Sequence, residues 1–272
     1  MNATTTSKPL AIDWLTVMAI SALAYVLSTA LHEHGGHASA CVALGGSVRA
    51  FGAFYVDCDY RAMGDAAIRL VAIAGPVASV LSGLIAVRLL HIARAQLSRL
   101  FCWLMASIGL MTGFGYMMFS AVAGIGDFGV GPDGALHGVP MEWLWRLLMG
   151  IGGYLLYDRS VLWSMRRLAA FTGGFEDRAQ RVRRISLACY IAGCAASVVI
   201  GLFNPLGVVI VLSSAAAASL GGTSGFAWGP YRARIGAGDS GATVFPRSWA
   251  WIVVAVVVVL AYGVVFGPSI SA

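Results

Sequence analysis

Residues 14–40 read "WLTVMAISALAYVLSTALHEHGGHASA", an apolar run that ends in three histidines and a glutamate. The apolar part, 14–31, is long enough to cross a bilayer, because a transmembrane helix needs roughly 20 residues. The polar part holds His32, Glu33, His34 and His37. Ionisable side chains are costly inside a membrane and mark candidate functional sites there. The stretch therefore predicts a membrane helix with a functional site at its end.

The whole chain has the composition of a multi-pass membrane protein. Of its 272 residues, 59% are hydrophobic and 11% are charged, and the mean hydropathy is +0.81. Soluble domains carry about 25% charged residues, so this composition excludes an ordinary soluble domain. Five runs are long enough to span a bilayer: 14–31, 66–90, 100–123, 185–203 and 249–266.

Two further segments bring the expected number of transmembrane helices to about six. The segment 143–157 is apolar, but it is interrupted by Arg146 and is short for a span. The segment 206–220 follows an Asn-Pro pair and is either a span or a re-entrant piece. The predicted fold class is an all-α polytopic integral membrane protein, with a short strand-like hairpin after the first helix. We expect a single transmembrane domain over 1–272.

Arginines predict the orientation of the spans. The segment 158–184, expected to be a basic loop, contains Arg166, Arg167, Arg178, Arg181, Arg183 and Arg184, and the link after residue 90 adds Arg94 and Arg99. The positive-inside rule places both in the cytoplasm, so the loops over 45–65 and 124–142 lie outside. A nucleic-acid surface is the rival interpretation. Basic juxtamembrane loops so commonly orient spans and contact anionic lipid that we expect no nucleic-acid partner.

The cysteines give no motif. Cys41, Cys58, Cys102, Cys189 and Cys194 are odd in number and lack the spacing of paired motifs. Most lie in apolar runs, where a free cysteine behaves as a small hydrophobe. We therefore expect neither a disulfide framework nor a cysteine metal site.

The polar cluster differs by one residue from a zinc-protease helix. In an H-E-x-x-H helix, two histidines four positions apart bind zinc from one face, and the glutamate beside the metal acts as general base. Here the fifth position is Gly36 and the second histidine is His37. On a regular helix His32 and His37 lie about 140° apart, too far round to share one metal ion.

Two helix geometries would restore a metal site. A π-bulge at the two glycines widens one turn to i→i+5, brings His32 and His37 onto one face and leaves Glu33 free as a base. A regular helix would instead cluster Glu33, His34 and His37, with the glutamate as a ligand. We prefer the bulge, because it retains a histidine pair and a free carboxylate. Without a metal, the same side chains would form a hydrogen-bonded polar cap on the span.

A catalytic zinc site takes three protein ligands and one water. The segment "AVAGIGDFGVGPDG", 121–134, ends the third span with Asp127 between glycines, and Asp133 and His137 follow. With the arginine-based orientation, the first and third spans both run outward, so the histidines and Asp127 lie at the same depth. We therefore predict Asp127 as the third ligand. An ordinary turn aspartate is the alternative.

Three segments in order resemble the site-2 protease family of intramembrane zinc metalloproteases, in particular its small, domain-poor members. They are "LHEHGGHASACVALGGSVRAFGAF" at 31–54, "VAIAGPVASVLSGL" at 71–84 and "GIGDFG" at 124–129. The resemblance covers the metal-site half of the chain, 12–140. The second helical half, 141–272, resembles no family that we recognise.

The resemblance implies a zinc endopeptidase that cleaves membrane-associated proteins or peptides, located in a bacterial inner (plasma) membrane. It makes His32, His37 and Asp127 the zinc ligands and Glu33 the general base, which takes a proton from water as the peptide carbonyl is attacked. The segment 47–60 alternates like a strand, and its edge would hold an extended substrate by strand addition. In several members of the family the site faces the cytosol, whereas the arginines place it outside here.

Two other classes of function use the same residues. A transporter or channel would employ the histidine cluster as a proton relay or a metal passage. A relay needs ionisable residues along several spans, and the other firm spans offer little beyond Arg69 and Arg88 near their ends. A catalytically inactive pseudoprotease would bind membrane proteins without cleaving them, and the altered histidine spacing is the best argument for it.

Overall fold

The computed structural model describes residues 12–172, 178–206, 208–210, 217–235 and 244–271. It is mainly helical, with one small sheet. The elements are α1 (Trp14–His32), the π-helix η1 (Glu33–Ala38), α2 (Ser39–Ala43), β1 (Ser47–Phe51), β2 (Val56–Asp59), α3 (Asp65–Ile92), α4 (Gln96–Ala123), α5 (Glu142–Phe171), α6 (Arg178–Gly201), α7 (Val208–Ile210), the π-helix η3 (Ala217–Gly221), α8 (Gly225–Arg232), α9 (Trp249–Phe266) and β3 (Ile270–Ser271).

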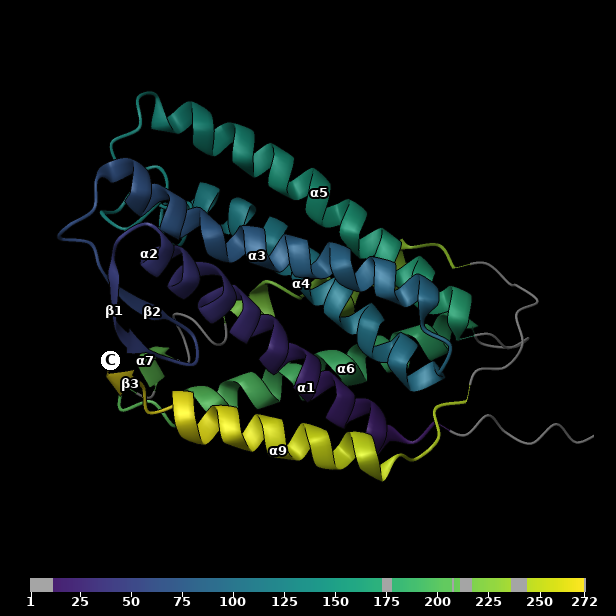
Figure 1. Ribbon diagram of the computed structural model, residues 1–272. Helices are drawn as coiled ribbons and strands as arrows, with labels where there is room; N and C mark the ends of the chain where they lie inside the picture. The colour runs from purple at the N-terminus through teal and green to yellow at the C-terminus, as the bar shows by residue number, and fades with distance from the viewer. Residues whose placement is uncertain (1–11, 173–177, 207, 211–216, 236–243, 272) are drawn as a thin grey trace, which may run out of the picture.

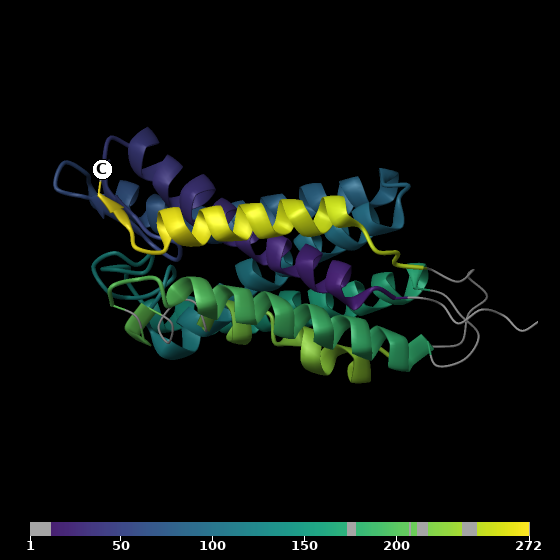
Figure 2. The same cartoon turned by 90° about the horizontal axis from the view of Figure 1, so that it is seen from below.

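The long helices lie side by side in one bundle (Figures 1 and 2). The central helix α1 packs against α3, α4, α6 and α9, while α5 lies at the outside against α4 and α8. The core is formed where α1, α4, α5 and α6 meet, and it contains the fully buried Ile20, Trp103, Met165 and Ile185. This arrangement encloses α4 most, because it is packed between α3 and α5.

Five helices of the described chain are long and apolar enough to cross a membrane. They are Trp14–Ala43, Asp65–Ile92, Gln96–Ala123, Arg178–Gly201 and Trp249–Phe266. Each contains most of one of the five predicted apolar runs, so the sequence located them correctly. The first is longer than its apolar run, because α1 continues through η1 into α2 without a break.

The expected sixth span is not among these five helices, and its segment forms a longer helix than predicted. Instead of ending at residue 157, α5 continues to Phe171. Arg146 does not interrupt it, because its guanidinium lies along α4 and donates hydrogen bonds to the carbonyl oxygens of Ala121 (3.0 Å) and Val122 (3.1 Å). These carbonyls end α4 and lack partners within the helix, so an arginine is well placed there.

Two other expectations need correction or remain open. The basic loop predicted over 158–184 is wrong in its structure, because α5 extends to residue 171 and α6 begins at residue 178, with 173–177 outside the described residues. In the candidate span 206–220, residues 207 and 211–216 lie outside the described residues, and the remainder contains only the short α7 and η3.

The strand-like hairpin after the first helix is confirmed. In the antiparallel pair of β1 and β2, Ser47 lies opposite Asp59 and Phe51 lies opposite Val56. The C-terminal β3 pairs with the other side of β1, so the strand order is β2-β1-β3 and β2 is an edge strand. In Figure 1 this sheet lies at the left end of the bundle, whereas the 93–95 link lies at the right end.

Candidate metal centre

The cluster at the end of α1 lies in a π-helical turn. Residues Glu33–Ala38 form η1, directly after α1 ends at His32. The preferred geometry of the sequence analysis, a bulge at the glycine pair, is therefore confirmed, and the regular helix is wrong. Gly36 lets α3 lie directly against this turn, because a Cβ atom at Gly36 would lie 2.6 Å from Cα of Gly75 in α3. Only a glycine lets the two backbones approach so closely.

Both histidines of the widened turn are held through Nδ1. His37 Nδ1 lies 2.8 Å from the carbonyl oxygen of Val71, and His32 Nδ1 lies 2.9 Å from Oγ of Ser79. A carbonyl only accepts, so His37 must carry its proton on Nδ1, and in the neutral ring Nε2 keeps its lone pair. Metal-binding histidines in proteins are commonly oriented by such a bond from the second ring nitrogen.

The free ring nitrogens converge on Asp127. The two Nε2 atoms of His32 and His37 are 3.3 Å apart. Asp127 Oδ2 lies 3.3 Å from His32 Nε2, and Oδ1 lies 3.5 Å from His37 Nε2. His32, His37 and Asp127 thus meet at one point, as predicted from the depth of the two spans. About 90 residues of sequence separate Asp127 from the histidines.

These separations fit a tetrahedral zinc ion. With bonds of about 2.0–2.1 Å, two ligand atoms of a tetrahedral zinc lie about 3.4 Å apart. Among the described residues, Asp127 Oδ2 is buried and has no hydrogen-bond partner. A buried carboxylate oxygen without a partner carries a desolvation cost of a few kcal/mol, and a bound cation would remove it.

Asp127 is placed by two glycines in the left-handed conformation. Gly124 (φ 73°) ends α4, and Gly126 (φ 81°) turns the chain back over the bundle. Burial raises the pKa of Asp127, but the facing His32 and His37 outweigh it and hold this pKa below its ordinary value. The carboxylate is therefore anionic, which suits a metal ligand.

Glu33 lies next to the two histidines. Its carboxylate and one nitrogen from each of His32 and His37 all lie within 4.8 Å of one another. Glu33 is buried, at 7% exposure. It can therefore act either as a base beside the metal or as a further ligand, the two roles that the sequence left open.

Gly75 brings α3 against both imidazoles. A Cβ atom at this position would lie 2.2 Å from His37 Nε2 and 2.7 Å from His32 Nε2. The glycine of the Ala-Gly-Pro segment has no side chain, and it therefore leaves the space that the two imidazoles occupy. Tyr116 of α4 completes the enclosure, with its ring stacked on His32 at 4.9 Å between centroids.

A large cavity opens on the centre. It has a volume of about 870 Å³, and it is lined by Glu33, His37 and Asp127 together with β2 and the 125–134 loop. Val56 and Cys58 of the edge strand form part of its wall. A cavity of this size accommodates several residues of an extended peptide next to the centre.

A second, small cavity also borders Glu33. Its volume is about 30 Å³, which is room for about two water molecules. Hydroxyl groups line it, including those of Ser28, Thr112, Tyr116 and Ser197. Glu33 therefore borders both the large cavity and a polar chamber. No local sequence pattern indicates this chamber, because its serines and threonines come from several helices.

The remaining polar candidates lie away from the centre. His34 Nε2 lies 3.0 Å from the carbonyl oxygen of Gly52, and its ring packs against Phe266, so it stabilises the hairpin. His137 is exposed and lies 3.1 Å from the carbonyl oxygen of Val130. Asp133 lines the large cavity. Val71 and Ser79, which orient the histidines, were missed because a backbone carbonyl and a single serine give no sequence signal.

The interpretation of the cysteines is partly wrong. Cys102, Cys189 and Cys194 are free and buried, as predicted. Cys41 and Cys58, however, form a disulfide. The pair was overlooked because the two residues are 17 positions apart with no motif, and only the fold-back of the hairpin brings them together.

Comparison of the chain with protein-family models, curated proteins and solved structures gave no match.

Proposed function

We propose that the protein is a multi-pass membrane protein with an intramembrane zinc endopeptidase centre. His32, His37 and Asp127 hold the metal, and Glu33 is the general base. The substrate is a membrane-associated protein or peptide, and the proposed location is a bacterial inner (plasma) membrane. The ordered resemblance of three segments to site-2 proteases agrees with this proposal.

The outer surface of the bundle supports membrane insertion. Large apolar side chains stand about half exposed or more along the outside of the long helices, for example Leu81 and Ile85 on α3 and Val257 and Leu260 on α9. Soluble monomers rarely expose contiguous apolar surfaces of this extent, because burying them in contact with a partner or a membrane is favourable. A lipid bilayer is the partner that covers such a belt on all sides.

The separation of the three ligand atoms is the observation that carries the zinc proposal. Nitrogen and oxygen atoms at 3.3–3.5 Å from one another match the edge of a zinc tetrahedron. A polar cap would bring hydrogen-bond donors to acceptors. Here His37 carries a proton on Nδ1, so in the neutral ring the lone pair of Nε2 faces the carboxylate of Asp127. A cation relieves that repulsion.

The residues around the centre fit peptide hydrolysis. A bound zinc ion supplies a Lewis acid that polarises the peptide carbonyl and acidifies water. Glu33 accepts the proton of the attacking water and delivers it to the departing amine, as a general base and then a general acid. The small chamber that Glu33 borders has room for water next to this carboxylate. Tyr116 and α3 exclude bulk solvent from the histidine side.

The edge strand fits the binding of an extended substrate. The side of β2 that does not pair with β1 has backbone groups available for a further strand, and its residues line the large cavity. Strand addition satisfies the backbone of a peptide whose helix has unwound, which proteolysis within a membrane requires.

A proton relay is less well supported. Such a path needs ionisable groups in series across the bundle. Among the described residues, the other buried carboxylate is Asp158, and it pairs with Arg232 at 2.7 Å on α5 and α8. The small chamber that Glu33 borders is lined by hydroxyl groups, so the ionisable residues form one local site.

The proposal is tested by zinc content and proteolysis of the purified full chain in detergent micelles. We expect about one zinc ion per wild-type chain, loss of zinc in His37→Ala and retention in the control His91→Ala, which changes an exposed histidine at the far end of α3. Glu33→Gln should keep the zinc and lose cleavage by about 10²–10⁴-fold. The probes are single-span apolar peptides that carry a fluorophore and a quencher.

Each outcome separates one candidate function from another. Equal zinc content in wild-type and His37→Ala protein would rule out the metal site and leave the polar cap. Zinc without cleavage of any probe by the wild-type protein would favour the pseudoprotease. Loss of zinc in Glu33→Gln would make Glu33 a ligand and overturn its role as base.

A further inference from the structure

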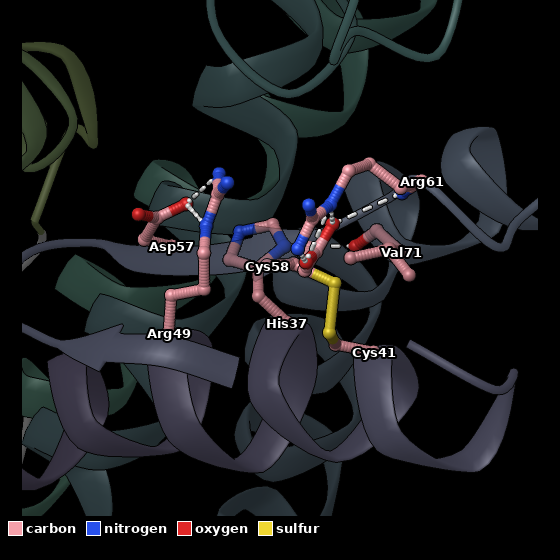
Figure 3. The surroundings of a disulfide bond; sticks show 8 residues. His37, Cys41, Arg49, Asp57, Cys58, Arg61 and Val71 are labelled. Carbon is pink, nitrogen blue, oxygen red and sulfur yellow. Dashed lines mark hydrogen bonds and ion pairs between the residues drawn. A yellow bond between two sulfur atoms is a disulfide. The ribbon is translucent and has the colours of Figure 1, made fainter. Parts of the chain in front are cut away.

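The disulfide between Cys41 and Cys58 joins the helix that carries the histidines to the edge strand. Cys41 lies in α2, four residues after His37, and Cys58 lies in β2. Figure 3 shows the bond next to His37 and Val71. The two Cα atoms are 6.1 Å apart, within the range of 4.4–6.8 Å that disulfides adopt.

The surroundings of the two sulfur atoms are shaped for the bond. Both cysteines are buried, and they form a small core with Val71. Gly46 closes this core, because its nitrogen donates to the carbonyl oxygen of Cys41 at 2.8 Å and a Cβ atom there would lie 3.0 Å from both sulfur atoms. Two unbonded thiols need more room than a disulfide, so reduction would push these segments apart.

The disulfide also reaches the ligand His37 through Val71. The side chain of Val71 packs on the two cysteines, while its carbonyl oxygen accepts the hydrogen bond from His37 Nδ1. Cys58 and Val71 both line the large cavity. The bond therefore fixes the orientation of one metal ligand and the position of the strand edge in the same place.

The disulfide indicates on which side of the membrane the metal centre lies. Disulfides persist in oxidising compartments and are rare in the cytosol. Forming this one removes two electrons and two protons from the two thiols, and a thiol–disulfide oxidoreductase of such a compartment accepts them. The arginines at the facing ends of α5 and α6 and beside the 93–95 link lie at the opposite end of the bundle (Figure 1). The positive-inside rule places that end in the cytoplasm.

We infer that the metal centre faces the oxidising, non-cytoplasmic side of the membrane and that the Cys41–Cys58 disulfide is a positioning element of this centre. The inference rests on the proposed membrane insertion, and its second part also rests on the proposed metal site. It does not require that the protein be an active protease. The disulfide and the arginines are independent observations that place the centre on the same side.

The orientation is tested with a membrane-impermeant maleimide on intact cells. Gly131→Cys places a thiol on the exposed 125–134 loop with no atom within 4 Å of its Cβ, and Ala95→Cys places one in the exposed link at the other end. We expect labelling of Gly131→Cys in intact cells and of Ala95→Cys only after permeabilisation. The reverse pattern would overturn the inference. The same protein, alkylated without reductant, should show Cys41 and Cys58 unmodified by mass spectrometry, and free thiols there would also overturn it.

The positioning role is tested by zinc binding without the bond. We expect Cys41→Ala/Cys58→Ala to lower zinc affinity by about 10–100-fold, the usual effect of losing a group that orients a ligand. Cys102→Ala, which removes a buried free thiol, is the matched control and should bind zinc as the wild-type protein does. Unchanged affinity in the double variant would refute the positioning role.

A second measurement covers a double variant that does not fold. Folded wild-type protein loaded with Co²⁺ is treated with a phosphine reductant, and the visible absorption of the metal is followed. We expect the spectrum to change as the disulfide opens, and an unchanged spectrum with both thiols demonstrably free would refute the role. Failure of the proposed metal site would be recognised separately, because wild-type protein would then bind neither zinc nor cobalt.

Discussion

Replacing Gly75 by alanine should disable the metal centre without removing a single ligand. The new methyl carbon would lie 2.2 Å from His37 Nε2 and 2.7 Å from His32 Nε2. Non-bonded carbon and nitrogen atoms settle at about 3.5 Å, so the nearer imidazole must move by about 1 Å. The helix cannot retreat easily, because α3 also packs closely on α4, where a Cβ atom at Gly109 would lie 2.5 Å from the carbonyl oxygen of Ser79.

The expected effect follows from the tolerance of metal sites. Ligand distances in a metal site are held within about 0.2 Å, so a displacement of about 1 Å removes a ligand in practice. We expect zinc affinity to fall by at least about 100-fold, which corresponds to about 2.7 kcal/mol. Overpacking should also lower the free energy of unfolding by about 1–3 kcal/mol.

The assay is a zinc titration against a competing chelator, together with thermal unfolding of the metal-free protein. Gly152→Ala is the matched control, because it makes the same change in the middle of α5 where no atom lies within 4 Å of the new Cβ. This control should bind zinc normally and be slightly stabilised, by up to about 1 kcal/mol. Wild-type zinc affinity in Gly75→Ala would refute the placement of the imidazoles against α3.

Two further predictions concern residues of the two cavities that Glu33 borders. Asp127→Asn should weaken zinc binding and cleavage, and it should add little to the effect of His37→Ala, because ligands of one metal act as a unit. Asp133→Asn, in the same loop, is the matched control. A loss of zinc affinity in Asp133→Asn but not in Asp127→Asn would contradict the ligand assignment. Thr112→Val, which removes a hydroxyl group from the chamber at nearly constant shape, should lower kcat about fivefold, the worth of one hydrogen bond, with zinc content and KM unchanged. An unaltered kcat would show that the chamber takes no part in the reaction.

The sequence predicted the helices and the central cluster because both depend on local periodicity. The five long helices follow from apolar runs, and the π-helical turn follows from the five-residue spacing of His32 and His37. The meeting with Asp127 could be predicted because both spans run the same way, so their ends share one depth. In each case one rule of chain geometry was sufficient.

The missed features depend on contacts between distant segments. The partners of Cys41 and Val71 are set by the fold-back of the hairpin and by the angle of α3, which no local pattern encodes. Arg146 was interpreted as an interruption because its hydrogen bonds to the end of α4 are formed only after two helices pack. The charge of Arg146 therefore led to a wrong prediction of the length of α5.

The extra residue before His37 requires a π-helical turn, and contacts with neighbouring segments support this turn. A π-turn is rare in proteins and usually occurs as a single turn at a functional site. Here the turn is supported on one side by the contact between Gly36 and Gly75, and His37 is anchored to α3 through Val71. The residues that follow are tied to β2 by the Cys41 disulfide. A wide turn that faces two histidines inward is thus supported by two glycines, one backbone carbonyl and one covalent bond, and each support also fixes a wall of the centre.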